Sequence, residues 1–250
     1  MLPPRFFVPY TGFAPGNEVE LPTDEARHAS CVLRLVPGEQ AMVFDGRGNW
    51  AVGPVVRAEK DRVTIRATET GRDPVPDQDF TLACAWPQSA AVVDEIVARA
   101  TELGVDRLVF WRAERSQRAP ALSPRIERVA VAACKQCGRN HFPGFETAGG
   151  LDDVLGRDAS RTWFAAVEPG VLFPPGAWAR ATGNCGVLIG PEGGYTAREI
   201  TLLGQAGARP VSLGPWTLRV EVAATVASFL ILNGMGRLGT RMDGPRGDDA

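Results

Sequence analysis

The chain changes its hydrophobic rhythm after residue 72. Before this point, short apolar segments such as residues 41–44 and 63–65 recur, and residues 18–21 alternate between polar and apolar side chains. These patterns predict short strands with one buried face. Residues 45–48 (Asp-Gly-Arg-Gly) are typical of a hairpin turn between two of them. We therefore expect a small closed β-barrel in this first part of the chain.

From residue 80 onward, apolar strand patterns alternate with helical spacing. Residues 80–86 form an apolar run, and the apolar positions of residues 92–103 then recur every three or four residues. This order repeats toward the end of the chain and predicts an open, parallel α/β sheet. Residues 73–79 are polar, contain two prolines, and form the expected linker.

The last helical pattern is apolar over most of its length. We expect this helix to bury Val222, Val226, Phe229 and Leu230. Residues 239–250, which follow it, are polar and are predicted to form a disordered tail.

Two strand patterns near the end of the chain lead into glycine turns. One precedes Gly-Pro-Glu-Gly-Gly at residues 190–194, and the other, residues 211–213, precedes Gly214. Thr196 and Glu199 have the spacing of a helix capping box. Glycine at such a turn lets backbone N–H groups approach a ligand that a Cβ would exclude. Because parallel strands end at one edge of a sheet, the two turns predict one ligand site there.

Composition narrows the class of protein. Hydrophobic residues make up 44% and charged residues 22% of the 250 residues, as in ordinary globular proteins. The net charge of -2 does not by itself indicate nucleic-acid binding. Only two of the 27 Lys+Arg residues are lysines, and arginine both binds phosphate and stacks on bases, although codon bias explains most of this excess. One local cluster can form a positive surface: Arg112, Arg115, Arg118, Arg125, Arg128, Lys135 and Arg139.

The five cysteines indicate a reducing environment. Their odd number and their scatter among apolar segments argue against a disulfide framework. Cys134 and Cys137 form a C-x-x-C pair, but a zinc site would need further ligands and the chain has only two histidines, so we expect no metal. The sequence contains no signal-peptide pattern and no apolar run long enough for a membrane span. We therefore expect a cytoplasmic protein.

An ordered set of motifs resembles one family. Residues 188–195 read Leu-Ile-Gly-Pro-Glu-Gly-Gly-Tyr, and residues 213–221 contain Leu-Gly-Pro-x-x-Leu-Arg-x-Glu. Further matches follow the same order along the chain, at residues 28–35, 44–48, 100–105, 114–116 and 138–140. Spread over residues 5–236, this set resembles the RsmE family, which are methyltransferases of the knotted SPOUT superfamily that act on uridine N3 in 16S ribosomal RNA.

The resemblance implies both a fold and an activity. The fold would be α/β, with a SPOUT trefoil-knot methyltransferase domain at residues 80–238 and a PUA-like β-barrel RNA-binding domain at residues 1–72. The activity would be methylation of a uridine N3 in 16S ribosomal RNA, with S-adenosyl-L-methionine as the cofactor. The family also implies a homodimer, and the acidic net charge favours the small ribosomal subunit over free RNA as the substrate.

The resemblance also implies candidate site residues. Arg219 would stabilise the uridine anion, and Glu221 would hold that arginine or support the fold. A salt bridge from Arg219 to Glu221 or to a neighbouring helix is the purely structural alternative. The residues expected to bind the cofactor are Val167, Glu168, Ile189, Gly190, Glu192, Gly193, Gly194, Leu213, Gly214, Leu218 and Arg219. The residues expected to contact RNA are Arg5, His28, Arg34, Arg115, Arg139 and Asn140.

The chain departs from the family pattern in two places. Residues 88–95 contain no lysine where the family carries several, and Trp216, Val220 and Val222 replace an arginine and two threonines. Three alternatives therefore stay open: a SPOUT methyltransferase with another RNA target, a non-catalytic RNA-binding or assembly factor on the same fold, and a dinucleotide-dependent oxidoreductase. The third depends on a Gly-x-Gly-x-x-Ala pattern at residues 46–51, which is not followed by a helix pattern.

Overall fold

The structure is a computed structural model that describes residues 3–9, 12–116, 118–158, 160–167 and 183–238. The chain divides into two compact units. The first comprises Met1–Val75 and Val131–Phe142, and the second comprises Pro76–Ala130 and Pro143–Ala250. The predicted tail and the candidate Glu168 lie outside the described residues.

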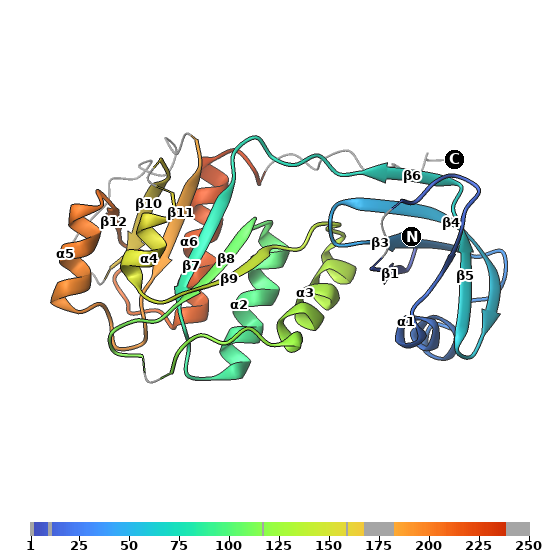
Figure 1. The fold of residues 1–250 in the computed structure, drawn as a ribbon, viewed down its shortest axis with the longest axis horizontal. Coiled ribbons are helices and arrows are strands. Elements are labelled where there is room, and N and C mark those ends of the chain that lie inside the picture. Colours follow the sequence, from blue (N-terminus) through green and yellow to red (C-terminus); the bar gives the residue numbers. More distant parts are fainter. Residues whose placement is uncertain (1–2, 10–11, 117, 159, 168–182, 239–250) are drawn as a thin grey trace. The chain divides into compact units, whose positions relative to one another are not determined.

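The first unit is built on a six-stranded sheet. Its strands follow the order β1-β3-β4-β5-β2, and β6 pairs with β4 (Figure 1). β1 and β3 run parallel, whereas the other neighbours are antiparallel. The elements are β1 (Arg5–Phe7), β2 (Glu18–Glu20), α1 (Thr23–Arg27), the π-helical turn η1 (His28–Val32), β3 (Gln40–Phe44), β4 (Asn49–Glu59), β5 (Arg62–Arg66) and β6 (Glu69–Arg72).

The long strand β4 serves both halves of this sheet. Its first half pairs with β3 and β6, and its second half pairs with β5 across a register shift between Val55 and Arg57. A Cβ on Gly53 would lie 1.8 Å from the carbonyl oxygen of Arg66, so only glycine allows the two strands to come this close. The enclosed core consists of fully buried apolar side chains, among them Phe6, Val43, Val63 and Ile65.

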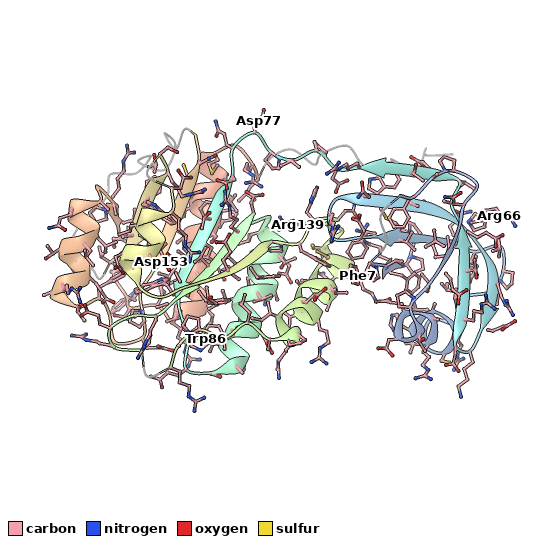
Figure 2. All side chains as sticks on the ribbon, viewed as in Figure 1. Phe7, Arg66, Asp77, Trp86, Arg139 and Asp153 are labelled. Carbon is pink, nitrogen blue, oxygen red and sulfur yellow. The ribbon has the colours of Figure 1, made fainter. Side chains whose placement is uncertain are left out.

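The end of α3 (Pro124–Cys137) and the residues after it complete the first unit. The Phe142 ring lies 5.2 Å from that of Phe7, which in turn lies 5.8 Å from Phe44. Figure 2 labels Phe7 among the side chains of this unit. Lys135 forms an ion pair of 2.7 Å with Glu25. The first unit therefore takes part of its packing from a segment far along the chain.

The second unit contains a six-stranded sheet in the order β12-β10-β11-β7-β8-β9, and all its neighbouring strands run parallel (Figure 1). The predicted open parallel sheet is therefore confirmed. Its elements are β7 (Phe80–Ala85), α2 (Ala90–Leu103), β8 (Arg107–Trp111), the first part of α3, β9 (Gly144–Ala148), α4 (Leu151–Gly156), β10 (Thr162–Ala166), β11 (Cys185–Ile189), α5 (Ala197–Gln205), β12 (Arg209–Val211) and α6 (Val220–Gly234).

Helices cover both faces of the parallel sheet. Val154 of α4 and Leu203 of α5 share one buried cluster with strand residues such as Leu188. Alternate strand positions, including Leu82 and Val187, are fully buried as well. Helix α6 packs on β7, β11 and α2, so this second face is covered by α2 and α6. No helix among the described residues has the length and apolarity that a bilayer crossing requires.

The prediction for the buried face of α6 is wrong. Val222 and Phe229 are 41% and 48% exposed, and Val226 and Leu230 are only half-buried. Because the helix is apolar around most of its circumference, spacing alone did not identify the packed face. The buried residues are smaller on average and let α6 approach the sheet closely: Val220, Ala223, Ala224, Ala227, Ser228, Ile231 and Leu232.

Two other sequence expectations are settled by the fold. The strand expected at residues 211–213 is shifted, because β12 ends at Val211 and leaves Leu213 in the following loop. Gly46 and Gly48 lie in the turn between β3 and β4, with φ of 73° and 95°. The strand β4 follows this turn where a dinucleotide-binding motif requires a helix, which excludes the oxidoreductase alternative.

Candidate active site

Three loops of the second unit begin level with one another at the carboxyl edge of the sheet. Ala166, the last residue of β10, is the register partner of both Ile189 in β11 and Val211 in β12. Ile189 is in turn the partner of Cys84 in β7. Neighbouring strands lie about 4.8 Å apart, so the loops after these strands start close together. Strand order also reverses between β7 and β11, which is where open α/β sheets bind ligands.

The loop after β11, residues 190–196, is fixed by the start of α5. Thr196 Oγ1 accepts a hydrogen bond of 3.2 Å from the Glu199 backbone N–H, and a Glu199 carboxylate oxygen accepts one of 2.7 Å from the Thr196 N–H. The predicted capping box is therefore confirmed. Gly194 closes the turn through a bond of 2.9 Å to the Pro191 carbonyl, and its φ of 70° favours glycine.

Glu199 also joins this loop to the loop after β8. Glu199 is only 2% exposed, and its carboxylate accepts a second hydrogen bond, of 3.0 Å, from the Glu114 N–H. The Glu114 carboxylate accepts a bond of 2.7 Å from Thr196 Oγ1 and pairs with Arg198 at 3.1 Å. We call Glu114, Thr196, Arg198 and Glu199 the Glu199 network.

Side chains from the same region support the glycines of residues 190–196. Arg115 donates to the Gly193 carbonyl oxygen, so a residue predicted to contact RNA also contacts the glycine loop. The Tyr195 ring stacks on Trp111 with centroids 6.2 Å apart and planes 10° apart. A Cβ on Gly190 would lie 3.0 Å from the Tyr195 ring, so glycine permits this close packing.

The hydroxyl of Tyr195 is an unusual feature of this support. Part of the residue reaches solvent, but the hydroxyl oxygen is buried and has no hydrogen-bond partner in the described part of the chain. Burial raises the pKa of Tyr195 well above its ordinary value. Negative charge on the nearby Cys84 and Glu199 raises this pKa further. This hydroxyl therefore stays protonated at neutral pH and serves no acid–base role there.

The segment between β12 and α6, residues 212–219, has far fewer bonds. A turn links Ser212 Oγ to Gly214 at 3.2 Å, and Gly214 has a φ of 131°. Trp216 is 79% exposed. Arg219 is the exposed N-cap residue of α6, and its guanidinium makes no hydrogen bond or ion pair with any described residue.

Two carboxylates lie near the same edge. Cys84 is buried at the end of β7, and its pKa is raised first by burial and then by the charges of Glu192 and Glu221. Both carboxylates are therefore close enough to act on the point where strand order reverses. Glu221 lies in the first turn of α6, where the helix dipole favours a negative charge. Within the described residues, Arg219 forms no salt bridge with Glu221 or with a neighbouring helix, so the purely structural alternative finds no support there.

The lining between the loops suits an adenine-containing cofactor. Ile189 is buried, whereas Val167, Leu213 and Leu218 are half-buried and keep apolar surface at the edge. Gly193 is exposed and presents backbone without a side chain. An apolar wall beside accessible backbone donors and acceptors can hold a flat heterocycle without charged side chains.

Arg5 and Asn140, both predicted to contact RNA, are hydrogen-bonded to each other inside the first unit. A guanidinium nitrogen of Arg5 donates to Asn140 Oδ1 and, at 3.2 Å, to the Arg139 carbonyl. Asn140 is 4% exposed and donates a second bond of 3.0 Å to Asp73. Burial lowers the pKa of Arg5, partly offset by nearby negative charge. The two side chains are used to hold this unit together.

The other candidates in the first unit are more accessible. His28 is half-buried and meets the Phe6 ring edge to face, with centroids 6.3 Å apart. Arg34 is exposed and has a φ of 56°, a left-handed conformation that costs about 1–2 kcal/mol for a residue with a Cβ. Arg139 is half-buried. No residue of this unit belongs to the loops at the sheet edge.

The C-x-x-C pair does not gather metal ligands. Cys134 is buried, Cys137 is exposed, and burial raises the pKa of Cys134 to about 12. Within the described ranges, no group of three or more His, Cys, Asp or Glu side chains is arranged as a metal site.

Sequence reasoning missed part of the support for the glycine loop. Thr196 and Glu199 carry a local signal, their spacing of three residues. Glu114 reaches the same network from 82 and 85 residues away, and Trp111 comes from the same distant strand end. Nothing in the local pattern around Glu114 or Trp111 indicates these contacts.

Two family models match this architecture. Residues 74–232 match an RNA methyltransferase domain, and residues 21–68 match an RNA methyltransferase PUA domain. The fold and the loops thus define a class, the RNA methyltransferases that join a PUA domain to an α/β catalytic domain.

Relatives that match over most of their length narrow this class. Ribosomal RNA small subunit methyltransferase E of Mycobacterium bovis is 30% identical over 238 residues, which cover 90% of this chain and 88% of the relative. The protein of the same name from Aquifex aeolicus is 29% identical over 222 residues, or 87% of this chain and 95% of the relative. The chain belongs to the ribosomal RNA small subunit methyltransferase E family, in agreement with the resemblance of its motifs.

Solved structures agree with this assignment. Ribosomal RNA small subunit methyltransferase E from Neisseria gonorrhoeae, bound to S-adenosyl methionine, has a TM-score of 0.80 at 26% identity, over 93% of this chain and 98% of that one. A probable rRNA-methyltransferase from Porphyromonas gingivalis has a TM-score of 0.81 at 27% identity, over the same shares of 93% and 98%. The predicted fold class, with an N-terminal PUA domain and a C-terminal methyltransferase domain, is confirmed.

Proposed function

We propose that this protein transfers the methyl group of S-adenosyl-L-methionine to N3 of a uridine in 16S ribosomal RNA. One observation carries the proposal: a bonded glycine loop at residues 190–196 shares a sheet edge with Arg219, whose guanidinium has no partner among the described residues. The loop suits the cofactor, and the arginine suits a reacting anion. The names of the relatives and the S-adenosyl methionine bound to the gonococcal protein support the same reaction.

The cofactor residues divide into backbone and wall. Gly190, Gly193 and Gly194 would contact the adenosine through their backbone, while Leu213 and Leu218 would cover its faces. S-adenosyl-L-methionine supplies an activated methyl group when bound, and this chemistry needs no metal. Because the Glu199 network holds the loop, little of it has to be ordered on binding. Val167, Ile189, Gly214 and Glu192 complete the proposed site.

Methylation at N3 requires that the uracil ring lose its N3 proton. Arg219 would stabilise the resulting negative charge, and its charge is available because no described acid pairs with it. Glu221, in the first turn of the same helix, is our choice for the group that accepts the proton or orients Arg219. Glu192 is the other carboxylate whose charge reaches this edge.

The first unit would bind the ribosomal RNA. We keep residues 1–72 as the PUA-like domain, 73–79 as the linker and 80–238 as the catalytic domain. His28, Arg34 and Arg139 are the proposed RNA contacts of the first unit, and Arg115 is that of the second. The net charge of -2 favours the assembled small subunit, in the cytoplasm, over free RNA as the substrate.

The active form would be a homodimer. Val222, Val226 and Phe229 lie on one stripe of α6 at intervals of four and three residues, and the described part of the chain leaves this apolar stripe partly uncovered. A second copy of α6 would bury it. Phe229→Asp should then halve the molar mass measured by light scattering, whereas an unchanged mass would place the contact elsewhere.

The decisive experiment is methyl transfer from labelled S-adenosyl-L-methionine to small ribosomal subunits from a strain that lacks this gene. Mass spectrometry would identify the modified base, and a single 3-methyluridine is the expected result. Absence of label on subunits that the gonococcal relative does methylate would contradict the proposal and favour a non-catalytic assembly factor. Label on a different RNA would favour a SPOUT enzyme with another target.

A further inference from the structure

Trp216 differs from the other described tryptophans in its exposure. Trp50, Trp111 and Trp163 are 8%, 0% and 6% exposed, and the half-buried Trp86 packs edge to face on Phe110 with ring centroids 5.0 Å apart. Trp216 is 79% exposed and makes no ring contact with a described residue. A free indole leaves a large apolar surface in water, so its position calls for a partner.

The position of Trp216 is defined by the active-site edge. Gly214 turns the chain with a φ of 131°, Pro215 follows, and Arg219 begins α6 three residues after Trp216. The segment starts after Val211, which is level with the other strand ends. The indole and the guanidinium, which has no described partner, therefore lie on one short segment at the same sheet edge as the glycine loop.

The surroundings of Trp216 favour a nucleic-acid base as its partner. Gly214, Thr217 and Arg219 are exposed and carry no large apolar side chain, and Leu213 and Leu218 are half-buried, so Trp216 is the one large apolar side chain that residues 212–219 expose. A protein interface normally buries a cluster of apolar side chains at its centre, which is not the setting of this residue. A single aromatic face beside an arginine is instead the usual arrangement for stacking an unpaired base next to its phosphate.

We propose that Trp216 stacks on a base of the substrate RNA at or next to the target uridine. This inference rests on the proposed function, because it names how that site holds its RNA. Stacking would place the uracil in the plane that the methyl transfer requires and would draw the flipped nucleotide out of its strand. Trp216 is thus a substrate-positioning residue, separate from the cofactor contacts.

The test compares Trp216→Ala, Trp216→Phe and Trp216→Leu by steady-state methylation of small subunits. Stacking on a base contributes about 1–3 kcal/mol, so the alanine variant should raise the KM for subunits about 5- to 150-fold. Phenylalanine should restore most of this loss, and leucine, which is apolar but has no π face, should not. The Kd for S-adenosyl-L-methionine should remain unchanged in all three variants. Val75→Ala, which removes a 68% exposed apolar side chain from the linker at residues 73–79, is the matched control.

Direct binding separates this inference from the proposed reaction. Indole fluorescence of the wild-type protein should be quenched when small subunits bind, and the quenching should be reduced in Trp216→Phe. This readout does not depend on methyl transfer, so a wild-type protein that binds but does not methylate would remove the proposed function alone. An unchanged KM in Trp216→Ala would overturn the stacking role. A weaker Kd for the cofactor would also overturn it, because the indole would then contact the cofactor. A lower molar mass would overturn it by assigning the indole to the contact with a second copy.

Discussion

The two loops that form the candidate active site are held in opposite ways. Residues 190–196 are tied to the start of α5 and to the loop after β8 by the Glu199 network and by Arg115. Among the described residues, the side chains of residues 212–219 form only a local turn at Gly214, and this segment carries the exposed Trp216 and an Arg219 side chain without a described partner. The first loop is ordered before any ligand arrives, whereas the second leaves its side chains available.

This difference matches the two ligands that a methyltransferase must handle. The cofactor is small and identical in every turnover, so a preformed loop binds it at little entropic cost. The RNA is large, and its own contacts can order the side chains that meet it. We infer that the well-bonded loop, residues 190–196, serves the cofactor and that the sparsely bonded loop, residues 212–219, serves the RNA. Each prediction below tests one of these two loops.

The largest effect on the reaction rate should come from a substitution in residues 212–219. Arg219→Ala should lower kcat about 100- to 1,000-fold, as expected for the loss of a charge that stabilises a developing anion. The melting temperature should not change, because the side chain is exposed and bonds no described residue. Rates on small subunits and calorimetric melting of the same preparations would check both statements.

The controls for Arg219 are a charge-preserving variant and a second surface arginine. Arg219→Lys should retain part of the rate, since it keeps the charge but not the planar geometry. Arg99→Ala removes an exposed arginine of α2 that pairs with Glu102 at 2.9 Å, and its rate should stay within about two-fold of wild type. A fall in the melting temperature of Arg219→Ala would assign this residue to the fold instead.

A substitution in the Glu199 network, which holds residues 190–196, should have a smaller effect on the rate but a clear effect on stability. Glu199→Ala removes a buried carboxylate and leaves the partly buried Thr196 and Glu114 N–H groups without their acceptor, which costs about 2–4 kcal/mol. The melting temperature should fall by about 5–15 °C. The Kd for S-adenosyl-L-methionine should rise about 10-fold, because part of its binding energy must then order the loop. Calorimetry and isothermal titration measure the two quantities.

Glu114→Ala tests the exposed half of the same network. It removes the acceptor of Thr196 Oγ1 and the partner of Arg198, but it keeps the backbone bond to Glu199. The stability loss should stay below about 1 kcal/mol, as for exposed pairs. Equal losses in the two variants would show that burial of Glu199 is not what fixes the loop.

Local hydrogen-bond patterns were read correctly from the sequence, whereas contacts across the chain were not. The capping box was predicted because Thr196 and Glu199 bond within one helical turn. The bond between Arg5 and Asn140 joins residues 135 positions apart, and each had been interpreted as a separate RNA contact. Only the fold shows that these two polar side chains are hydrogen-bonded to each other.

Helix faces illustrate a second limit. In α6, Val222 and Phe229 are as apolar as the residues that pack on the sheet, so the sequence offers no polar face for orientation. The sheet selects the alanine-rich face because small side chains let the helix axis approach. The resemblance to the family, in contrast, identified the class of enzyme from motifs that periodicity could not interpret.

The smallest effect should come from Tyr195→Phe, which leaves the bonded loop intact. The hydroxyl has no partner among the described residues and is buried, so its removal should leave stability equal or increase it by up to about 1 kcal/mol at pH 7. Tyr195→Ala, which also loses the stacking on Trp111, should cost about 3–5 kcal/mol.

The pH dependence of the same variant sharpens this expectation. Because burial raises the pKa of Tyr195 in the folded protein above that in the unfolded chain, ionisation favours unfolding once the pH exceeds the unfolded value of about 10. The wild type should therefore lose stability from about pH 10 upward, and Tyr195→Phe should lose less over the same range. Urea unfolding at pH 7 and pH 10.5 would measure this difference, and identical pH slopes would mean that the hydroxyl ionises as freely in the folded protein as in water. The loop would then be more open, and less different from residues 212–219, than its hydrogen bonds indicate.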